Sequence, residues 1–283
     1  AGGARNFSVT ADSLPLHAPC TTTPAGGAAS LRPRAIHELQ GRLDGRSGPT
    51  NDVRLQLGVR PGSGNQLFAC RTAALQAGEL YSRTLPQRYQ RYWQQPRFTP
   101  DYGHWKSLLA REAAVMAQSQ GRNRLTILVG DSLSLWLPTE QLPQDRFWLN
   151  QSISGETTSQ VLARLHYFRG TRPTEIHIMA GINDLKNGAS DGEVIRNIQQ
   201  MLVHLRQQHP QARLVIYSIL PTRLGNLPSD RIRQINRYIA YVAAQQGADF
   251  ADLQATFSDH HGLLRREFTT DGLHLSQQGY RAW

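Results

Sequence analysis

The pattern of apolar positions changes near residue 122. From there to the C-terminus, short continuous apolar runs alternate with longer segments whose apolar residues recur every three to four positions. Short continuous runs are typical of buried parallel strands, and the longer spacing is typical of amphipathic helices. The predicted strands are Leu125–Val129, Phe147–Leu149, Ile176–Met179, Leu214–Tyr217 and Ala248–Ala251. Alternation of strands and helices predicts a parallel sheet with right-handed crossovers.

Residues 1–120 read as an N-terminal extension that packs on a domain formed by residues 121–283. Gly and Pro interrupt the pattern up to about residue 60, with one short helix expected over residues 35–43. Helical spacing returns from residue 64. Between these later helices, tyrosines, Trp93, Phe98 and arginines are expected to pack the helical layer, and a stacking platform for bases or sugars is the alternative.

Several polar residues predict where helices begin. Asn65 and Asp101 precede helical patterns in the extension, and Ser276 precedes the last one. Ser190 starts a capping-box pattern. Pro228 opens a further helix.

Length and charge narrow the class of protein without naming a function. A chain of 283 residues predicts one or two domains. Its net charge of +10 is scattered, and no nucleic-acid-binding motif accompanies it, so no specific nucleic-acid partner is expected. A basic module for an anionic polymer or lipid, using Arg88, Arg91 and Arg97, is kept as an alternative.

Membrane, redox and compartment questions are mostly open at this stage. No apolar run is long enough to span a bilayer, so no transmembrane segment is expected. Cys20 and Cys70 can form one bridge or both stay unpaired. The chain begins with Ala1, so removal of a signal peptide is one interpretation, and a cytoplasmic or exported location and the oligomeric state are both open.

Candidate chemistry begins after the first predicted strand, where Gly130 leads into Asp131 and Ser132. Open α/β sheets place their ligand crevice at the carboxyl ends of strands, so Ser132 is a candidate nucleophile. Alternatively, an Asp-Ser pair in this place simply caps the next helix. A nucleophile needs a base and hydrogen-bond donors for the oxyanion that it creates.

Three later loops provide those groups. Gly155, which follows the second predicted strand, leaves its backbone N–H accessible, and Asn183 follows the third with a neutral amide donor. Asp271 lies three residues before His274 and can hold its imidazole in the tautomer that accepts a proton from serine. Adjacent histidines such as His260 and His261 do not readily face one ion, so no metal site is expected.

These four motifs, in this order, resemble the SGNH (GDSL) hydrolase superfamily over residues 122–283. The resemblance implies a flavodoxin-like three-layer α/β/α sandwich with a five-stranded parallel sheet. It implies Ser132 as nucleophile, His274 as base and Asp271 as its partner, with Ser132, Gly155 and Asn183 as the oxyanion hole. It implies no metal and no organic cofactor.

The same resemblance implies a serine esterase, a carboxylic ester hydrolase acting on a small-molecule, lipid or sugar ester. Thioesterase, lysophospholipase and O-acyltransferase activities share the motifs and remain alternatives. Arg223 and Leu224, after the fourth predicted strand, are expected to line the substrate mouth. The extension from about residue 64 resembles that of cyanobacterial members. The family usually continues the helix after Ser276 beyond the point where this chain ends, so weaker packing behind His274 is expected.

Overall fold

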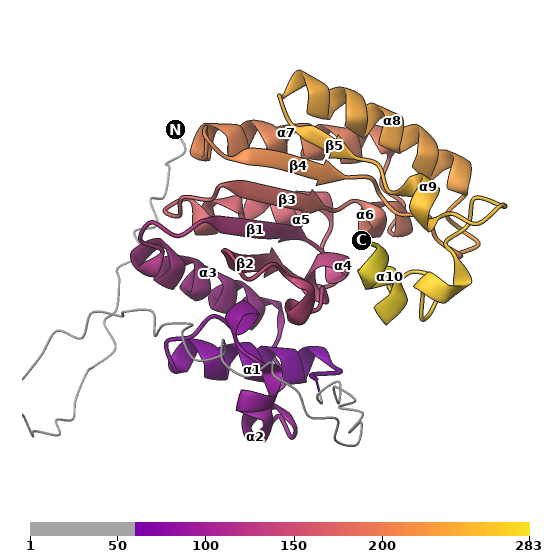
Figure 1. Cartoon of the computed structure of the whole chain (residues 1–283). Helices are drawn as coiled ribbons and strands as arrows, with labels where there is room; N and C mark the ends of the chain where they lie inside the picture. The colour runs from indigo at the N-terminus through magenta and orange to yellow at the C-terminus, as the bar shows by residue number, and fades with distance from the viewer. Residues whose placement is uncertain (1–59) are drawn as a thin grey trace, which may run out of the picture. The chain divides into compact units, whose positions relative to one another are not determined.

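Five parallel strands form one sheet, in the order β2-β1-β3-β4-β5, in the computed structural model, which describes residues 60–283 (Figure 1). The strands are β1 (Leu125–Gly130), β2 (Phe147–Ser152), β3 (Glu175–Met179), β4 (Arg213–Tyr217) and β5 (Asp249–Ala251). This is the flavodoxin-like order, whose direction reverses between β1 and β3. The predicted α/β class with a five-stranded parallel sheet is confirmed. Strand β2 runs further than predicted because Asn150, Gln151 and Ser152 still pair with the end of β1.

One face of the sheet is covered by four helices, which together bury the main core. They are α3 (Tyr102–Ser119), α5 (Thr158–Ala163), α7 (Asp191–Gln208) and α8 (Ser229–Gln245). Alternate strand residues such as Ile127, Ile178 and Ile216 point to this face and are almost fully buried. The period of two along each strand therefore assigns the core face, as expected for a pleated sheet.

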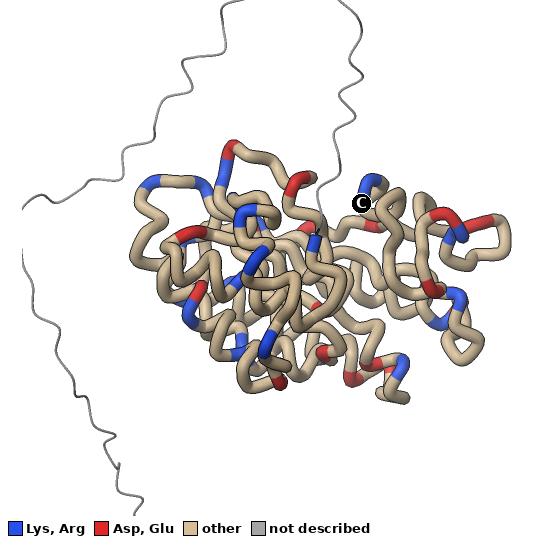
Figure 2. Tube along the Cα trace, turned by 90° about the horizontal axis from the view of Figure 1, so that it is seen from below, with Lys and Arg blue, Asp and Glu red and all other residues tan. Residues whose placement is uncertain are grey.

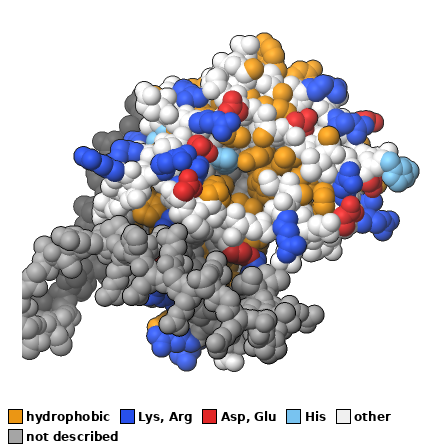
Figure 3. Space-filling view, viewed as in Figure 1, with side chains coloured by type: hydrophobic (Ala, Val, Ile, Leu, Met, Phe, Trp, Pro, Cys, Tyr) orange, Lys and Arg blue, Asp and Glu red, His pale blue; other side chains and the backbone are white. Residues whose placement is uncertain are grey.

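The opposite face is covered by shorter elements. Helix α4 (Ser132–Leu135) and helix α10 (Gln277–Ala282) pack there around Met179, Phe257 and Leu275. Figure 3 shows hydrophobic side chains gathered in the middle of this face, around the C-terminal end of the chain. The nucleophile candidate and the last helix thus share one side of the sheet.

The two long helices before β1 begin at polar caps, one of which is the expected residue. The hydroxyl of Ser63 accepts a hydrogen bond from the N–H of Gln66, 3.3 Å away, and caps α1 (Gly64–Gln76). Asn65, predicted to be the cap, lies inside the helix and donates instead to the hydroxyl of Thr99. Asp101 caps α3 as predicted, through a 2.8 Å hydrogen bond from the N–H of His104.

A buried ion pair joins the helices that precede β1, the N-terminal helical layer, to the sheet. Arg71 of α1 and Glu112 of α3 are both almost fully buried, and Arg71 Nε lies 3.0 Å from Glu112 Oε1. The same guanidinium donates to the carbonyl of Asn150 in β2, at 2.7 Å. Tyr89 and Trp93 are buried against α1, in line with the expected packing role, whereas Tyr92 and Phe98 are each 49% exposed. The layer is therefore joined to the strand that precedes Gly155.

Some predictions fall on residues 1–59, which lie outside the described part of the chain. These are the helix over residues 35–43 and the state of Cys20; Cys70 is buried in α1. Within residues 60–283, none of the helices has the length and apolarity needed to cross a membrane. Figure 2 shows acidic and basic positions interspersed along this part of the chain.

His209, at the end of α7, is expected to make stability depend on pH. Its ring is buried and stacks on Phe168, with ring centres 5.6 Å apart, and burial lowers its pKa from 6.5 to about 4. Between these pH values the His209 side chain is protonated in the unfolded chain and neutral in the folded chain. The free energy of unfolding should therefore fall as pH drops below about 6.5, by about 3 kcal/mol in all.

Urea unfolding of the wild type and of His209→Phe, at several pH values, checks this expectation. Taking the difference at each pH cancels the contributions of other titrating groups. Gln207→Phe, at an exposed position of the same helix that does not titrate, is the matched control and should show a pH-independent difference. An equally flat difference for His209→Phe would contradict the assignment.

Candidate active site

The end of β1 places Ser132 at the carboxyl edge of the sheet. A side chain at Gly130 would bring its Cβ to 2.0 Å from the carbonyl oxygen of Met179, so only glycine fits there. Asp131 is fully buried and its Oδ1 accepts a hydrogen bond from the N–H of Leu133, at 3.0 Å, which starts α4. Burial raises the pKa of Asp131 to about 7. The carboxyl thus holds the loop in shape beside Ser132.

His274 joins Ser132 to Asp271 through two hydrogen bonds. Its Nε2 lies 3.1 Å from Ser132 Oγ, and its Nδ1 lies 2.7 Å from Asp271 Oδ2. Burial raises the pKa of Asp271, but the hydrogen bonds from His274 and from the N–H of Leu273 outweigh it and lower the pKa to about 2. A carboxylate that stays ionised can stabilise a positive charge on the imidazole.

Asp271 and His274 belong to one tight turn. Thr269 and Leu275 close the turn as an antiparallel bridge. Asp271 Oδ1 accepts the N–H groups of Leu273 and His274, at 2.9 and 2.7 Å. Thr269 Oγ1 donates to the carbonyl of His274, at 2.7 Å. The carboxylate and the imidazole are therefore positioned by contacts within seven residues.

The loops after β2 and β3 bring hydrogen-bond donors to the carboxyl edge of the sheet, where Ser132 lies. Gly155 has a φ of +81°, which side-chain-bearing residues rarely adopt. Asn183 is buried and its Nδ2 donates to the carbonyl of Glu156, at 3.0 Å, which leaves its second amide hydrogen unused by this bond. Asp184 accepts the N–H and hydroxyl of Thr158, at 2.8 and 2.5 Å. These bonds join the two loops on either side of β1.

A second buried ion pair lies directly beneath these loops. Arg164 and Glu156 are both almost completely buried, and Arg164 Nε lies 2.8 Å from each carboxylate oxygen. The guanidinium also donates to the carbonyls of Gly130, at 3.2 Å, and of Gln151. From α3, the Tyr102 hydroxyl reaches Glu156 Oε1 at 3.0 Å. The Arg164 side chain thus connects the ends of β1 and β2 with Glu156, the residue after Gly155.

The structure therefore brings five predicted residues to one edge of the sheet. Ser132, His274 and Asp271 form a hydrogen-bonded chain, and Gly155 and Asn183 follow the strands on either side of β1. Sequence reasoning missed Arg164 and Glu156, because no local pattern distinguishes them from other charged residues.

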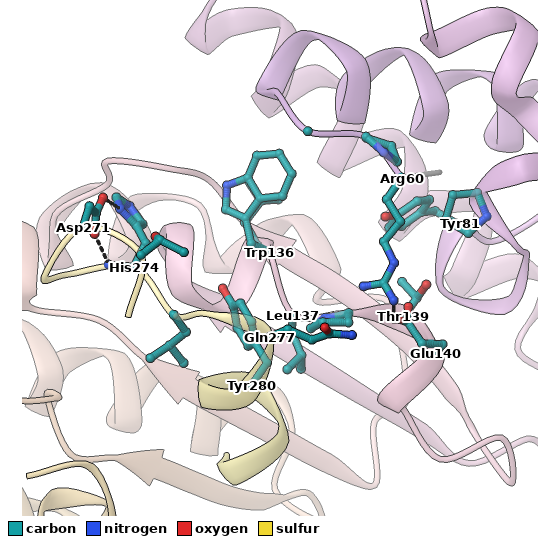
Figure 4. Close-up of a pocket in the computed structure, with 17 residues that line it drawn as sticks. Arg60, Tyr81, Trp136, Leu137, Thr139, Glu140, Asp271, His274, Gln277 and Tyr280 are labelled. Carbon is teal, nitrogen blue, oxygen red and sulfur yellow. Dashed lines mark hydrogen bonds and ion pairs between the residues drawn. The ribbon is translucent and has the colours of Figure 1, made fainter. Parts of the chain in front are cut away.

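A cavity of about 540 Å³ opens beside the histidine. Its wall includes residues 60–62, Tyr81 and Pro86, residues 135–140 after the loop of Ser132, and the segment from Thr270 to Tyr280 that contains Asp271 and His274. Figure 4 shows Asp271 and His274 at one end of this group of side chains, the paired Arg60 and Glu140 at the other, and Trp136 between them. Ser132, Gly155 and Asn183 do not contribute to the wall.

Arg223 and Leu224 do not line this cavity. Arg223 Nη2 instead pairs with Asp259 Oδ2, at 2.7 Å, and its backbone N–H donates to the carbonyl of Gly272, in the turn that holds Asp271 and His274, at 2.8 Å. Leu224 packs against the main core. Their expected contact with substrate stays a prediction.

The alternative binding surface has weaker support. Arg88 pairs with Glu79, at 2.8 Å, and the guanidinium of Arg91 lies over the ring of Tyr92. Two of its three arginines thus already have partners within the chain.

Over residues 60–283, no group of three or more His, Cys, Asp or Glu side chains is arranged to hold a metal ion.

Comparisons with known proteins find related sequences and a shared fold. A family model described as the GDSL-like lipase/acylhydrolase family matches residues 118–282. Human platelet-activating factor acetylhydrolase IB subunit alpha1 is 29% identical over 188 residues, which cover 63% of this chain and 78% of the human protein. The chicken alpha2 subunit is 27% identical over 165 residues, 54% of this chain and 70% of that protein. The structure of a GDSL-like lipase from Bacteroides thetaiotaomicron shares the fold, with a TM-score of 0.53 and 18% identity over 64% of this chain and 94% of that one.

Proposed function

Because the chain belongs to the GDSL-like lipase/acylhydrolase family, we propose that it is a serine esterase that cleaves carboxylic esters through an acyl-enzyme. The observation that carries the proposal is the hydrogen-bonded chain from Ser132 through His274 to Asp271. A serine hydroxyl is a weak nucleophile unless a base accepts its proton during attack. The 3.1 Å distance from Ser132 Oγ to His274 Nε2 allows that transfer.

In the proposed first half-reaction, Ser132 Oγ bonds to the ester carbonyl carbon and its proton moves to His274 Nε2. The carbonyl oxygen becomes an oxyanion, for which the N–H groups of Ser132 and Gly155 and the amide of Asn183 are the proposed donors. The bond to the alcohol oxygen then breaks, and His274 returns the proton to that oxygen. The products are a free alcohol and an ester of Ser132.

In the second half-reaction, water attacks the acyl carbon and gives a proton to His274. The intermediate collapses, Ser132 recovers its proton and the acid leaves. The carboxylate of Asp271, with its lowered pKa, stays negative and stabilises the imidazolium in both halves. Thioesters and acyl transfer to a hydroxyl would use the same steps, with a different leaving group or a different acceptor.

Among acyl groups we favour short ones, since the human relative is named an acetylhydrolase. A hydrolysis screen with acetyl, butyryl, octanoyl and lauroyl p-nitrophenyl esters, sugar acetates and acyl-CoA tests the proposal. We expect the acetyl and butyryl esters to react fastest. Preferential turnover of acyl-CoA would instead favour a thioesterase.

Covalent labelling gives a test that is independent of substrate choice. A serine-reactive fluorophosphonate should attach to Ser132 in a one-to-one ratio and abolish hydrolysis, because the reagent copies the first half-reaction. Mass spectrometry of the peptide that contains Ser132 checks the position. Labelling of another serine, with hydrolysis lost in parallel, would refute Ser132 as the nucleophile.

A further inference from the structure

The cavity beside His274 indicates which part of an ester substrate, the acyl group or the alcohol, the protein selects. We propose that it receives the alcohol moiety of the substrate, and that this alcohol is bulky and mainly apolar, with a polar group at its far end. This inference rests on the proposed esterase function, and it adds the substrate class. It concerns the cavity of about 540 Å³ described above.

The direction of proton transfer places the alcohol on this side of Ser132. As the carbon–oxygen bond breaks, His274 Nε2 must donate its proton to the alcohol oxygen, so the leaving group lies against the imidazole. The oxyanion lies toward the proposed donors of Gly155 and Asn183, and neither residue lines the cavity. His274 does line it. Ser132 does not line it either, so the cavity begins beside the imidazole, on the leaving-group side of the reacting carbon.

The size and chemistry of the wall indicate what kind of alcohol fits. A volume of about 540 Å³ lies within the usual range for small-molecule sites and is far larger than a short acyl group requires. Trp136 and Leu137 offer an apolar surface between the histidine and the opposite end, and Leu275 also lines the cavity. Burial of an apolar alcohol against them removes that surface from water, which favours binding.

The end of the cavity away from the histidine carries charge. Arg60 and Glu140 pair there, with about a third of each side chain exposed, at 32% and 35%. A paired cation and anion can each hydrogen-bond a polar group while the other balances the charge. An alcohol with a polar terminus would therefore match both parts of the wall.

Part of this wall lies outside the family match. Arg60, Tyr81 and Pro86 precede residue 118, at which the match to the family begins. The extension therefore completes the cavity, while the motif loops contribute the reacting groups. Selectivity for the alcohol is then a property of this chain's own N-terminal helical layer.

A substitution that enlarges the cavity tests the proposal. In Trp136→Ala, kcat/KM should be compared for ethyl acetate and 2-naphthylmethyl acetate, which share an acyl group, and for ethyl acetate and ethyl octanoate, which share an alcohol. We expect the ratio of 2-naphthylmethyl to ethyl acetate to fall by about 10- to 100-fold, as is typical when apolar pocket contacts are lost. The octanoate-to-acetate ratio should keep its wild-type value.

Pre-steady-state measurements locate the effect. The loss should lie in formation of the acetyl-enzyme, since the alcohol has already left before water attacks. Gln277→Trp, at an exposed position of the wall, should lower the same ratio by filling the cavity, and it guards against misfolding of Trp136→Ala. Tyr241→Ala, an exposed aromatic residue of α8 outside the cavity, is the matched control and should keep the wild-type ratio.

Two outcomes would overturn the inference. A change that follows acyl length would make the cavity an acyl site, and unchanged ratios in both Trp136→Ala and Gln277→Trp would leave it without a role in substrate binding. Acetylation of Ser132 in the wild type is followed in the same experiment. Its absence would refute the proposed esterase itself, so the two failures are distinguishable.

Discussion

Replacement of Ser132 by alanine is expected to lower kcat for acetyl esters by at least about 10⁴-fold. Without Oγ no acyl-enzyme can form, and the remaining groups can only promote direct attack by water. The fold should be unchanged, because Ser132 contributes one partly exposed hydrogen bond, to His274. Release of p-nitrophenol and urea unfolding, measured on the same preparation, check both parts.

Ser134→Ala is the matched control for this substitution. Ser134 is a buried serine of the same short helix, two residues after the candidate nucleophile. No hydrogen bond links its hydroxyl to His274, so the variant should retain most of the wild-type activity. Full activity in Ser132→Ala would remove the basis of the proposed mechanism, whereas equal losses in both variants would indicate damage to the loop.

Replacement of Arg164 by methionine is expected to have the largest effect on stability. The substitution leaves the buried carboxylate of Glu156 without its charged partner and removes the hydrogen bonds from the guanidinium to the carbonyls of Gly130 and Gln151. Removal of one member of a buried ion pair typically lowers the free energy of unfolding by about 3–5 kcal/mol. Because those carbonyls belong to the ends of β1 and β2, kcat should fall as well, while KM changes less.

Three comparisons make the Arg164 prediction decisive. Arg169→Met, at a nearby exposed position, should alter stability by less than about 0.5 kcal/mol. The double variant Arg164→Met with Glu156→Gln should be more stable than Arg164→Met alone, since no unpaired charge remains. A loss below about 1 kcal/mol in Arg164→Met would show that the pair does not hold these loops together.

The strands and the position of the candidate site could be predicted from local patterns. Runs such as Leu125–Val129 are continuous and apolar because both faces of a parallel strand are covered, so the pattern carries the fold directly. Gly155 and Asn183 come after the second and third predicted strands, and these strands lie on either side of β1 in the sheet. Helix starts are harder to predict. Ser63 and Asn65 are both residue types that cap helices well, and only the backbone geometry selects Ser63 as the cap of α1.

The supporting structure could not be predicted in this way. Glu156 and Arg164 are eight positions apart, and their burial depends on the packing of α3 and of the strand ends around them. The cavity combines residues 60–62 with the turn that holds Asp271 and His274, more than 200 positions away in the sequence. Such long-range contacts leave no local period. The roles assigned to the triad and oxyanion residues remain predictions that the experiments above test.

The turn that holds Asp271 and His274, the proposed acid–base pair, is built mainly from local contacts. Most of the hydrogen bonds that set its geometry join residues 269–275, and one further backbone bond links Gly272 to Arg223, so few changes elsewhere in the chain should alter it. The cavity wall, by contrast, draws on segments distant in sequence. Selection or engineering can therefore remodel the alcohol preference through the N-terminal layer while the proton-transfer unit stays intact. We expect substrate scope among homologous chains to diverge faster than catalytic chemistry.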